Sequence, residues 1–253
     1  MPTVDKNWKI RRRLEDFVWR SDSAHNKRLR IIVENFIARF GTVGIVGGMI
    51  RDIALAGAKE FKSDVDFVLD APADEVRAFA ETVKATENRF GGFSYSAYRW
   101  KIDFWAREET WAFKNGLVDV GNLSDVTRAT FFVNDAVVYD LQARALYAHT
   151  DFLNSVIRKE LEINLWPNPS VQGNLVRAVR RLLKHDLTPG PRLSVFLDEH
   201  LSDELFEHVV ATECRLYGWS YAAPYGQANE LLTALNDRQS RSHNRSRQIE
   251  FTV

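Results

Sequence analysis

The chain begins with two stretches whose apolar residues recur at helical spacing. They cover residues 7–21 and 25–40, and in the second Leu29 and Ile32 stand three positions apart among basic and polar neighbours. Such spacing predicts two amphipathic helices. The next apolar run, residues 42–46, is short and β-branched, and it leads through two glycines into another helix-like stretch. This order predicts a strand, a glycine turn and a helix.

Short extended and helical patterns then alternate. An apolar strand pattern over residues 64–69 precedes a helical pattern over 73–85. A pair of extended segments split by Gly91 and Gly92 follows, the second containing residues 100–105, and another extended run covers 129–139. Alternation of this kind predicts a mixed sheet with helices packed on it. The fold class is therefore α/β for this part of the chain.

From residue 150 onward the pattern becomes helical. The expected helices cover residues 151–164, 171–186, 192–217 and 227–236. We therefore predict an α/β domain over residues 1–148 and an all-helical domain over 149–236. The last residues, 237–253, mix arginine with serine, asparagine and glutamine and show no apolar face, which predicts a mobile basic tail.

Composition narrows the class of protein. Of the 253 residues, 45% are hydrophobic and 27% charged, which is typical of a folded chain, and the formal net charge is zero. Affinity for nucleic acid would therefore come from local patches. The single cysteine, Cys214, rules out an intrachain disulfide. Because the N-terminus lacks a secretory apolar segment and no apolar run approaches membrane-spanning length, we expect a soluble, cytoplasmic protein that binds no membrane.

Three aspartates are candidate metal ligands. Asp64 and Asp66 lie two positions apart in a predicted strand, so their side chains share one face, roughly 6.6 Å apart. Asp103 lies inside another apolar strand and, with Lys101, faces the same side if the two strands are neighbours. Three converging carboxylates suit a two-magnesium site for phosphoryl transfer. A solvated strand face would carry the same Asp-X-Asp pair, so the pair alone does not decide.

The glycine turn makes the pattern more specific. Gly47 and Gly48 stand between a predicted strand and helix, where free backbone N–H groups and the helix dipole suit a phosphate. Arg51, one helical turn later, adds positive charge. A simple tight turn would need the same glycines, and Arg51 would form a surface ion pair with Asp52. The turn and the aspartate pair together are more specific than either alone.

The run GGMIRD at 47–52, followed by SDVD at 63–66, resembles the catalytic head of the CCA-adding enzyme and bacterial poly(A) polymerase family. The resemblance extends to about residue 186. It implies a polymerase-beta-type nucleotidyltransferase head with a mixed sheet, followed by a helical neck. It also implies an NTP substrate, an RNA acceptor and two Mg²⁺ ions held by Asp64, Asp66 and Asp103, which would be the catalytic residues.

Two further segments support the resemblance. Arg128 with FFVNDA at 131–136 looks like a degraded RRDFTINA motif of the family, and LVRAVR at 175–180 looks like its LRAVR helix. The arginines of that helix contact the nucleotide in the family, although a solvated basic stripe would show the same spacing. The predicted nucleotide-binding residues are Gly47, Gly48, Arg51, Arg128, Asn134, Arg177 and Arg180.

The departures from the family pattern bear on specificity. Val171 and Asn174 stand where the family has the aspartate and arginine that read the base, and Ala129 and Thr130 replace part of the RRD motif. The sequence also stops soon after the neck. We therefore do not expect CCA addition to transfer RNA, and the preferred NTP stays open.

Together these features predict a magnesium-dependent nucleotidyltransferase that moves an NMP from an NTP to an acceptor, with RNA as the first choice of acceptor. The nucleotide would lie between head and neck, and the basic N-terminal helix and tail would hold RNA. Two alternatives stay open. One is transfer to a protein or small molecule, and the other is a catalytically silent module that binds nucleotide or RNA.

Overall fold

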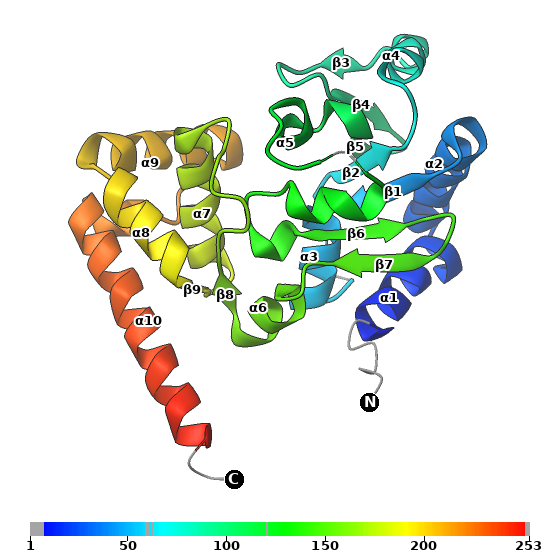
Figure 1. Ribbon diagram of the computed structural model, residues 1–253. Helices are drawn as coiled ribbons and strands as arrows, with labels where there is room; N and C mark the ends of the chain where they lie inside the picture. The colour runs from blue at the N-terminus through cyan, green and yellow to red at the C-terminus, as the bar shows by residue number, and fades with distance from the viewer. Residues whose placement is uncertain (1–7, 59–60, 62, 120, 251–253) are drawn as a thin grey trace. The chain divides into compact units, whose positions relative to one another are not determined.

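The computed structural model describes residues 8–58, 61, 63–119 and 121–250 (Figure 1). The chain divides after Val156 into two compact units. The predicted boundary at residue 148 falls at the end of the last strand of the first unit. The first unit contains the sheet, and the second is almost entirely helical.

The first unit is built on a mixed seven-stranded sheet with the order β3-β4-β5-β2-β1-β6-β7. All neighbouring strands are antiparallel except β2 and β5, which are parallel. The predicted mixed α/β sheet is therefore confirmed. The strands are β1 (Val43–Val46), β2 (Val65–Leu69), β3 (Thr86–Glu87), β4 (Phe93–Ala97), β5 (Trp100–Ala106), β6 (Val137–Asp140) and β7 (Ala145–Ala148).

Helices pack on one face of this sheet because its alternate side chains are aromatic and aliphatic. Phe36 of α2 lies with its ring centroid 4.9 Å from that of Phe67 on β2 and 5.6 Å from that of Phe104 on β5. Phe79 of α4 joins the same cluster. The helices that contribute to this core are α1 (Trp8–Glu15), the π-helical turn η1 (Asp16–Arg20), α2 (Ala24–Phe40), α3 (Gly48–Ala56) and α4 (Ala73–Thr82).

A smaller apolar cluster lies on the other face. Val46, Val68 and Val138 from the sheet pack with Leu123 and Phe113. These last two belong to 3₁₀ helix η3 (Leu123–Arg128) and α5 (Trp111–Lys114); η2 (Arg107–Glu109) precedes α5. The predicted extended run over residues 129–139 is wrong in its first part, because the short 3₁₀ helix η4 (Val133–Asp135) precedes β6.

The second unit is helical, as predicted, apart from the two-residue strands β8 (Glu160–Leu161) and β9 (Thr188–Pro189). The single helix expected over residues 192–217 is two helices, because Ser202 caps the second one with its side chain. The helices are α6 (Phe152–Arg158), which crosses the boundary between the units, α7 (Val171–Lys184), α8 (Pro191–His200), α9 (Asp203–Tyr217), η5 (Ala223–Tyr225) and α10 (Ala228–Glu250).

Helix α10 differs from the prediction for the C-terminus. The helix expected to end at residue 236 continues to Glu250, through most of the segment assigned to a tail. Local propensity explains the difference, since residues 237–250 contain no proline or glycine to stop a helix. Residues 251–253 lie outside the described part. None of the described helices has the length and apolarity needed to cross a membrane.

The aromatic cluster generates a prediction for stability. Phe104 is fully buried among four other rings, so Phe104→Ala is expected to lower the free energy of unfolding by about 3–5 kcal/mol. Urea denaturation measures the change, and Ile31→Ala, at a side chain that is 44% exposed on α2, is the control. A loss below about 1 kcal/mol for Phe104→Ala, the size expected of a surface substitution, would contradict this packing.

Candidate functional site

The parallel pairing of β2 and β5 brings the predicted carboxylates together. In its register Asp66 is the direct partner of Asp103 on the neighbouring strand. Asp64 immediately precedes β2. The fully buried Val65 separates it from Asp66 in the sequence. The side chains of Asp64 and Asp103 are 31% and 30% exposed. The carboxylates of Asp64 and Asp103 are therefore accessible to small ligands.

A lysine links two of these carboxylates. The Nζ atom of Lys101 lies 3.0 Å from Oδ2 of Asp64 and 3.9 Å from Oδ2 of Asp103. Asp64 also accepts a hydrogen bond from Ser63 at 2.5 Å. Burial acts to raise the pKa of Asp64, but these hydrogen bonds and the charge of Lys101 outweigh it and hold the pKa below its ordinary value. Asp64 is therefore ionised at neutral pH.

Asp66 has the opposite behaviour. Burial, and then the negative charges of Asp64, Asp103 and Asp135, raise the pKa of Asp66 to about 8, although Arg51 opposes the shift. At neutral pH this carboxyl group holds a proton unless another cation neutralises it. The site therefore carries more negative charge than its own residues compensate.

The residues present fit a divalent cation in two respects. Burial, and then the neighbouring negative charges, raise the pKa of Asp66, and Oδ1 of Asp103 is buried without a hydrogen-bond partner among the described residues. Oxygen ligands of this kind are those that magnesium prefers. However, no three His, Cys, Asp or Glu side chains in the described part of the chain are placed to hold one ion together. Instead, the ammonium of Lys101 bridges Asp64 and Asp103.

The glycine turn borders the same carboxylates. Gly47 has a φ of +57°, a conformation that favours glycine, and its N–H donates to the carbonyl of Val137 at 3.1 Å. That donor is consequently occupied. A Cβ atom on Gly48 would lie 3.6 Å from Oδ2 of Asp66, so Gly48 places the first turn of α3 directly against the carboxylate. The structure brings the turn and the aspartates together, as the sequence predicts.

Arg51 is held inside the head. Its Nη1 lies 2.5 Å from Oδ1 of Asp135, its Nη2 lies 2.8 Å from Oδ1 of Asp52, and the residue is only 8% exposed. The guanidinium therefore joins α3 to η4 and is not a freely exposed charge. Asp135 was not among the predicted site residues. The signal that would have found it is its place in the FFVNDA segment that was aligned with a family motif.

The two other head residues predicted to bind nucleotide differ in setting. Asn134, next to Asp135, is fully buried, and neither atom of its side-chain amide has a hydrogen-bond partner among the described residues. Arg128 is half-exposed and donates to Asp125 at 2.7 Å in a local ion pair. Asn134 adjoins Asp135 in the chain, and Asp135 pairs with Arg51, whereas Arg128 pairs with Asp125.

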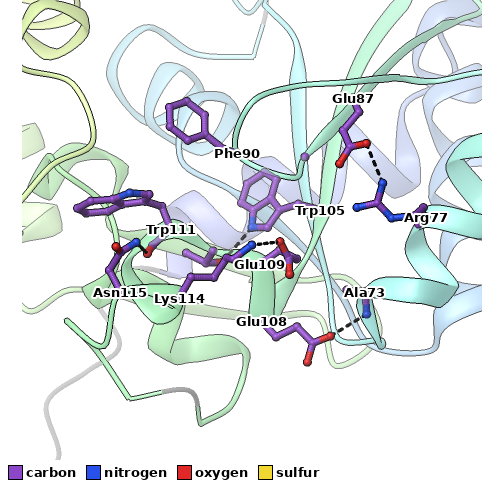
Figure 2. Close-up of polar contacts among 12 residues, drawn as sticks. Ala73, Arg77, Glu87, Phe90, Trp105, Glu108, Glu109, Trp111, Lys114 and Asn115 are labelled. Atoms are coloured by element: carbon purple, nitrogen blue, oxygen red, sulfur yellow. Dashed lines mark hydrogen bonds and ion pairs between the residues drawn. The ribbon is translucent and has the colours of Figure 1, made fainter.

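The face of β5 that carries Asp103 continues to Trp105, which packs against the smaller apolar cluster. The indole Nε1 of Trp105 donates to Oγ1 of Thr110 at 3.0 Å, and Lys114 lies 2.5 Å from Glu109. Figure 2 shows Trp105, Trp111 and Phe90 among these polar contacts. Phe90 is 41% exposed. The contacts hold the segment after β5 in a fixed position beside the carboxylate strands.

The predicted arginines of the second unit have partners within that unit. Arg177 donates through Nε to the carbonyl of Gly173 and through Nη2 to the side chain of Asn174. Arg180 donates at 3.0 Å to Glu213, which is fully buried, and its guanidinium lies 3.5 Å from the ring centre of Tyr217. Asn174 replaces the base-reading arginine of the family and is itself fully buried.

No family model and no curated protein matches the sequence. Solved structures do match. A tRNA nucleotidyltransferase complexed with a primer tRNA and an ATP analogue is 18% identical with a TM-score of 0.51, covering 82% of this chain and 60% of its own. The Thermotoga maritima CCA-adding enzyme with tRNA is 15% identical with a TM-score of 0.55, covering 89% and 53%.

A third structure, a CCA-adding enzyme with CTP, is 17% identical with a TM-score of 0.54 over 80% of this chain and 49% of that one. The chain thus spans between 49% and 60% of these three proteins. Similarity at this level of identity shows the fold. The predicted resemblance to CCA-adding enzymes is confirmed for the fold, an α/β unit with a mixed sheet and a helical unit.

The raised pKa of Asp66 predicts a pH dependence of stability in the presence of a chelator. Between the ordinary value of 3.8 and about 8, the folded protein binds a proton at Asp66 that the unfolded chain releases. The contribution of Asp66 to the free energy of unfolding therefore falls as pH rises, by about 1.4 kcal/mol per pH unit. Urea denaturation from pH 5 to 8 should show that Asp66→Asn removes this slope. Parallel curves for the two proteins would refute the assignment.

Proposed function

We propose that the chain is a divalent-cation-dependent nucleotidyltransferase, which moves an NMP from an NTP to an acceptor and releases pyrophosphate. The single observation that supports this most directly is the pairing of Asp66 with Asp103 on parallel strands, with Asp64 one residue before β2. This cluster lies against the turn at Gly48. A carboxylate cluster beside a helix N-terminus suits a triphosphate with its metal ions.

In the proposed site Asp64, Asp66 and Asp103 hold two Mg²⁺ ions. Bound there, the ions would supply charge neutralisation and a lowered pKa for the attacking hydroxyl group. The protein's part is to fix these oxygens, and the strand register does so without depending on flexible loops. Strand alternation places Lys101 and Trp105 on either side of Asp103 along the same face of β5.

The neighbouring residues are proposed to position the triphosphate. The N-terminus of α3 at Gly47 and Gly48 offers helix-dipole charge to the phosphates. Arg51 adds positive electrostatic potential near the phosphates while its ion pair holds Asp135 in place. The unpartnered amide of Asn134 is the proposed hydrogen-bonding group for the nucleotide in the head. Arg128 is proposed to reach the phosphates after release from its exposed pair.

Arg177 and Arg180 of α7 are the proposed nucleotide contacts of the helical unit. Use of Arg180 requires loss of its ion pair with the buried Glu213, so Arg177, which is exposed, is the easier contact to form. Val171 has no hydrogen-bonding side chain and Asn174 is buried, and hence we do not expect these two positions to select the base.

RNA is the proposed acceptor. The support is the shared fold with a tRNA nucleotidyltransferase solved with a primer tRNA and an ATP analogue. A silent nucleotide-binding module is the second candidate, and it is favoured by the lack of three described side chains placed to hold one ion. The two candidates differ in whether a covalent product forms.

Incubation with each α-labelled NTP, Mg²⁺ and total RNA tests the proposal. Transfer should give a nuclease-sensitive labelled product, and Asp64→Ala/Asp66→Ala should reduce it at least about 10³-fold, since the metal ligands are lost. Asp151→Asn is the matched control, because Asp151 is a carboxylate of the same unit whose side chain is 66% exposed.

Protease-sensitive label would move the acceptor from RNA to protein. Label that persists in the double variant would remove the carboxylates from the mechanism. If no NTP gives a labelled product while the protein still binds NTP, the silent module replaces the proposed enzyme.

A further inference from the structure

We propose that Lys101 is a resident counter-ion, whose ammonium occupies the position of a cation between Asp64 and Asp103 and leaves when a divalent cation binds. The inference rests on the proposed function, because it concerns the same carboxylates. It adds a positioning residue that controls how tightly the site takes up metal.

The geometry makes Lys101 part of the carboxylate cluster. It lies two residues before Asp103 on β5, and strand alternation therefore places both side chains on the same face of the sheet. Its Nζ lies within 4.0 Å of oxygens from both Asp64 and Asp103. One ammonium thus lies within ion-pair distance of carboxylates from β5 and from the residue before β2, which is the arrangement expected of a bound cation.

No other described cation is placed to do the same. Arg51 is a buried cation of the same unit, but its nitrogens are bound to Asp52 and Asp135 and it is 8% exposed. Its pairs are buried and costly to break. Arg51 is therefore a permanent part of the head, whereas the lysine is not.

Lys101 can leave easily. Its side chain is 60% exposed, and exposed ion pairs contribute little to stability because water competes for both charges. The long flexible stem lets the ammonium swing into solvent without moving β5. A divalent cation brings twice the charge to the same oxygens and therefore outcompetes it.

The ammonium has a use in the cation-free protein. Three neighbouring carboxylates repel each other, and Lys101 offsets part of that repulsion because its Nζ lies 3.0 Å from Asp64 and 3.9 Å from Asp103. The ammonium also competes with a divalent cation for these oxygens, because Lys101 has to be displaced before the cation binds. Removal of the charge should therefore destabilise the empty site and tighten the occupied one.

The test compares Mn²⁺ affinity of wild type, Lys101→Met and Lys101→Arg, from electron paramagnetic resonance of the free ion. Lys101→Met is expected to lower the Kd on the order of fivefold, because a positive charge is removed beside the ion. Lys101→Arg should restore the wild-type Kd. Lys114→Met is the matched control, since Lys114 is 48% exposed and pairs with Glu109 at 2.5 Å.

Thermal unfolding supplies a second reading. With chelator, Lys101→Met should melt below wild type, and with saturating Mn²⁺ the two should melt together. If Lys101 had only a structural role, Lys101→Met would lower the melting temperature equally with chelator and with Mn²⁺. That result, or a Kd for Mn²⁺ in Lys101→Met equal to or higher than that of wild type, overturns the inference.

A measurement on wild type avoids dependence on a folded variant. Acylation of lysines, resolved by mass spectrometry, should show that Mn²⁺ raises the reactivity of Lys101 and not that of Lys114. If Mn²⁺ leaves the ratio of Lys101 to Lys114 acylation unchanged, the ammonium is not displaced. If Mn²⁺ binding is lost in Asp64→Ala/Asp66→Ala but does not respond to Lys101, only this inference fails. If no protein binds Mn²⁺ through these aspartates, the proposed metal site fails with it.

Discussion

The parallel pairing of β2 with β5 is the constraint on which the site depends. It sets Asp66 directly beside Asp103, and so brings together like charges that a stable fold normally separates. Burial and this repulsion raise the pKa of Asp66 to about 8. The alternate residues of the same strands, such as Phe67 and Phe104, pack in the aromatic core beneath. Favourable burial on one face thus holds an unfavourable charge arrangement in place on the other.

Two arginines show how the structure distributes positive charge. Arg51 joins α3 to η4 through two carboxylates, and Arg180 joins α7 to α9 through Glu213 and the ring of Tyr217. Both were predicted as ligand contacts, and both are engaged within their own unit. Lys101 is the cation that touches the candidate metal ligands directly. Its exposure makes its ion pairs weak, and that weakness allows exchange with a stronger cation.

Sequence patterns predicted the carboxylate strands and the glycine turn because alternation and turn chemistry are local properties. The parallel pairing of β2 with β5 joins segments far apart in the chain, so local patterns did not predict it. The sequence placed Asp103 beside the aspartate pair only if the two strands are neighbours. A tertiary contact explains one error: η4 replaces part of an expected strand where Asp135 meets Arg51, 84 residues earlier in the chain. The apolar periodicity continues across residue 202, so it did not indicate that one helix ends and that Ser202 caps the start of α9. Helix α10 continues past its predicted end at residue 236. The segment that follows has no apolar face, but a helix can form without one.

The central claim is that Asp64, Asp66 and Asp103 jointly hold a divalent cation with the triphosphate beside the turn at Gly48. A crystal structure with Mn²⁺ and a non-hydrolysable NTP, using anomalous scattering from manganese, tests it most directly. The account predicts manganese peaks within coordination distance of these carboxylates, about 2.0–2.3 Å, and of phosphate oxygens at the N-terminus of α3. Nucleotide bound elsewhere, or bound here without manganese on any of the three aspartates, would contradict it.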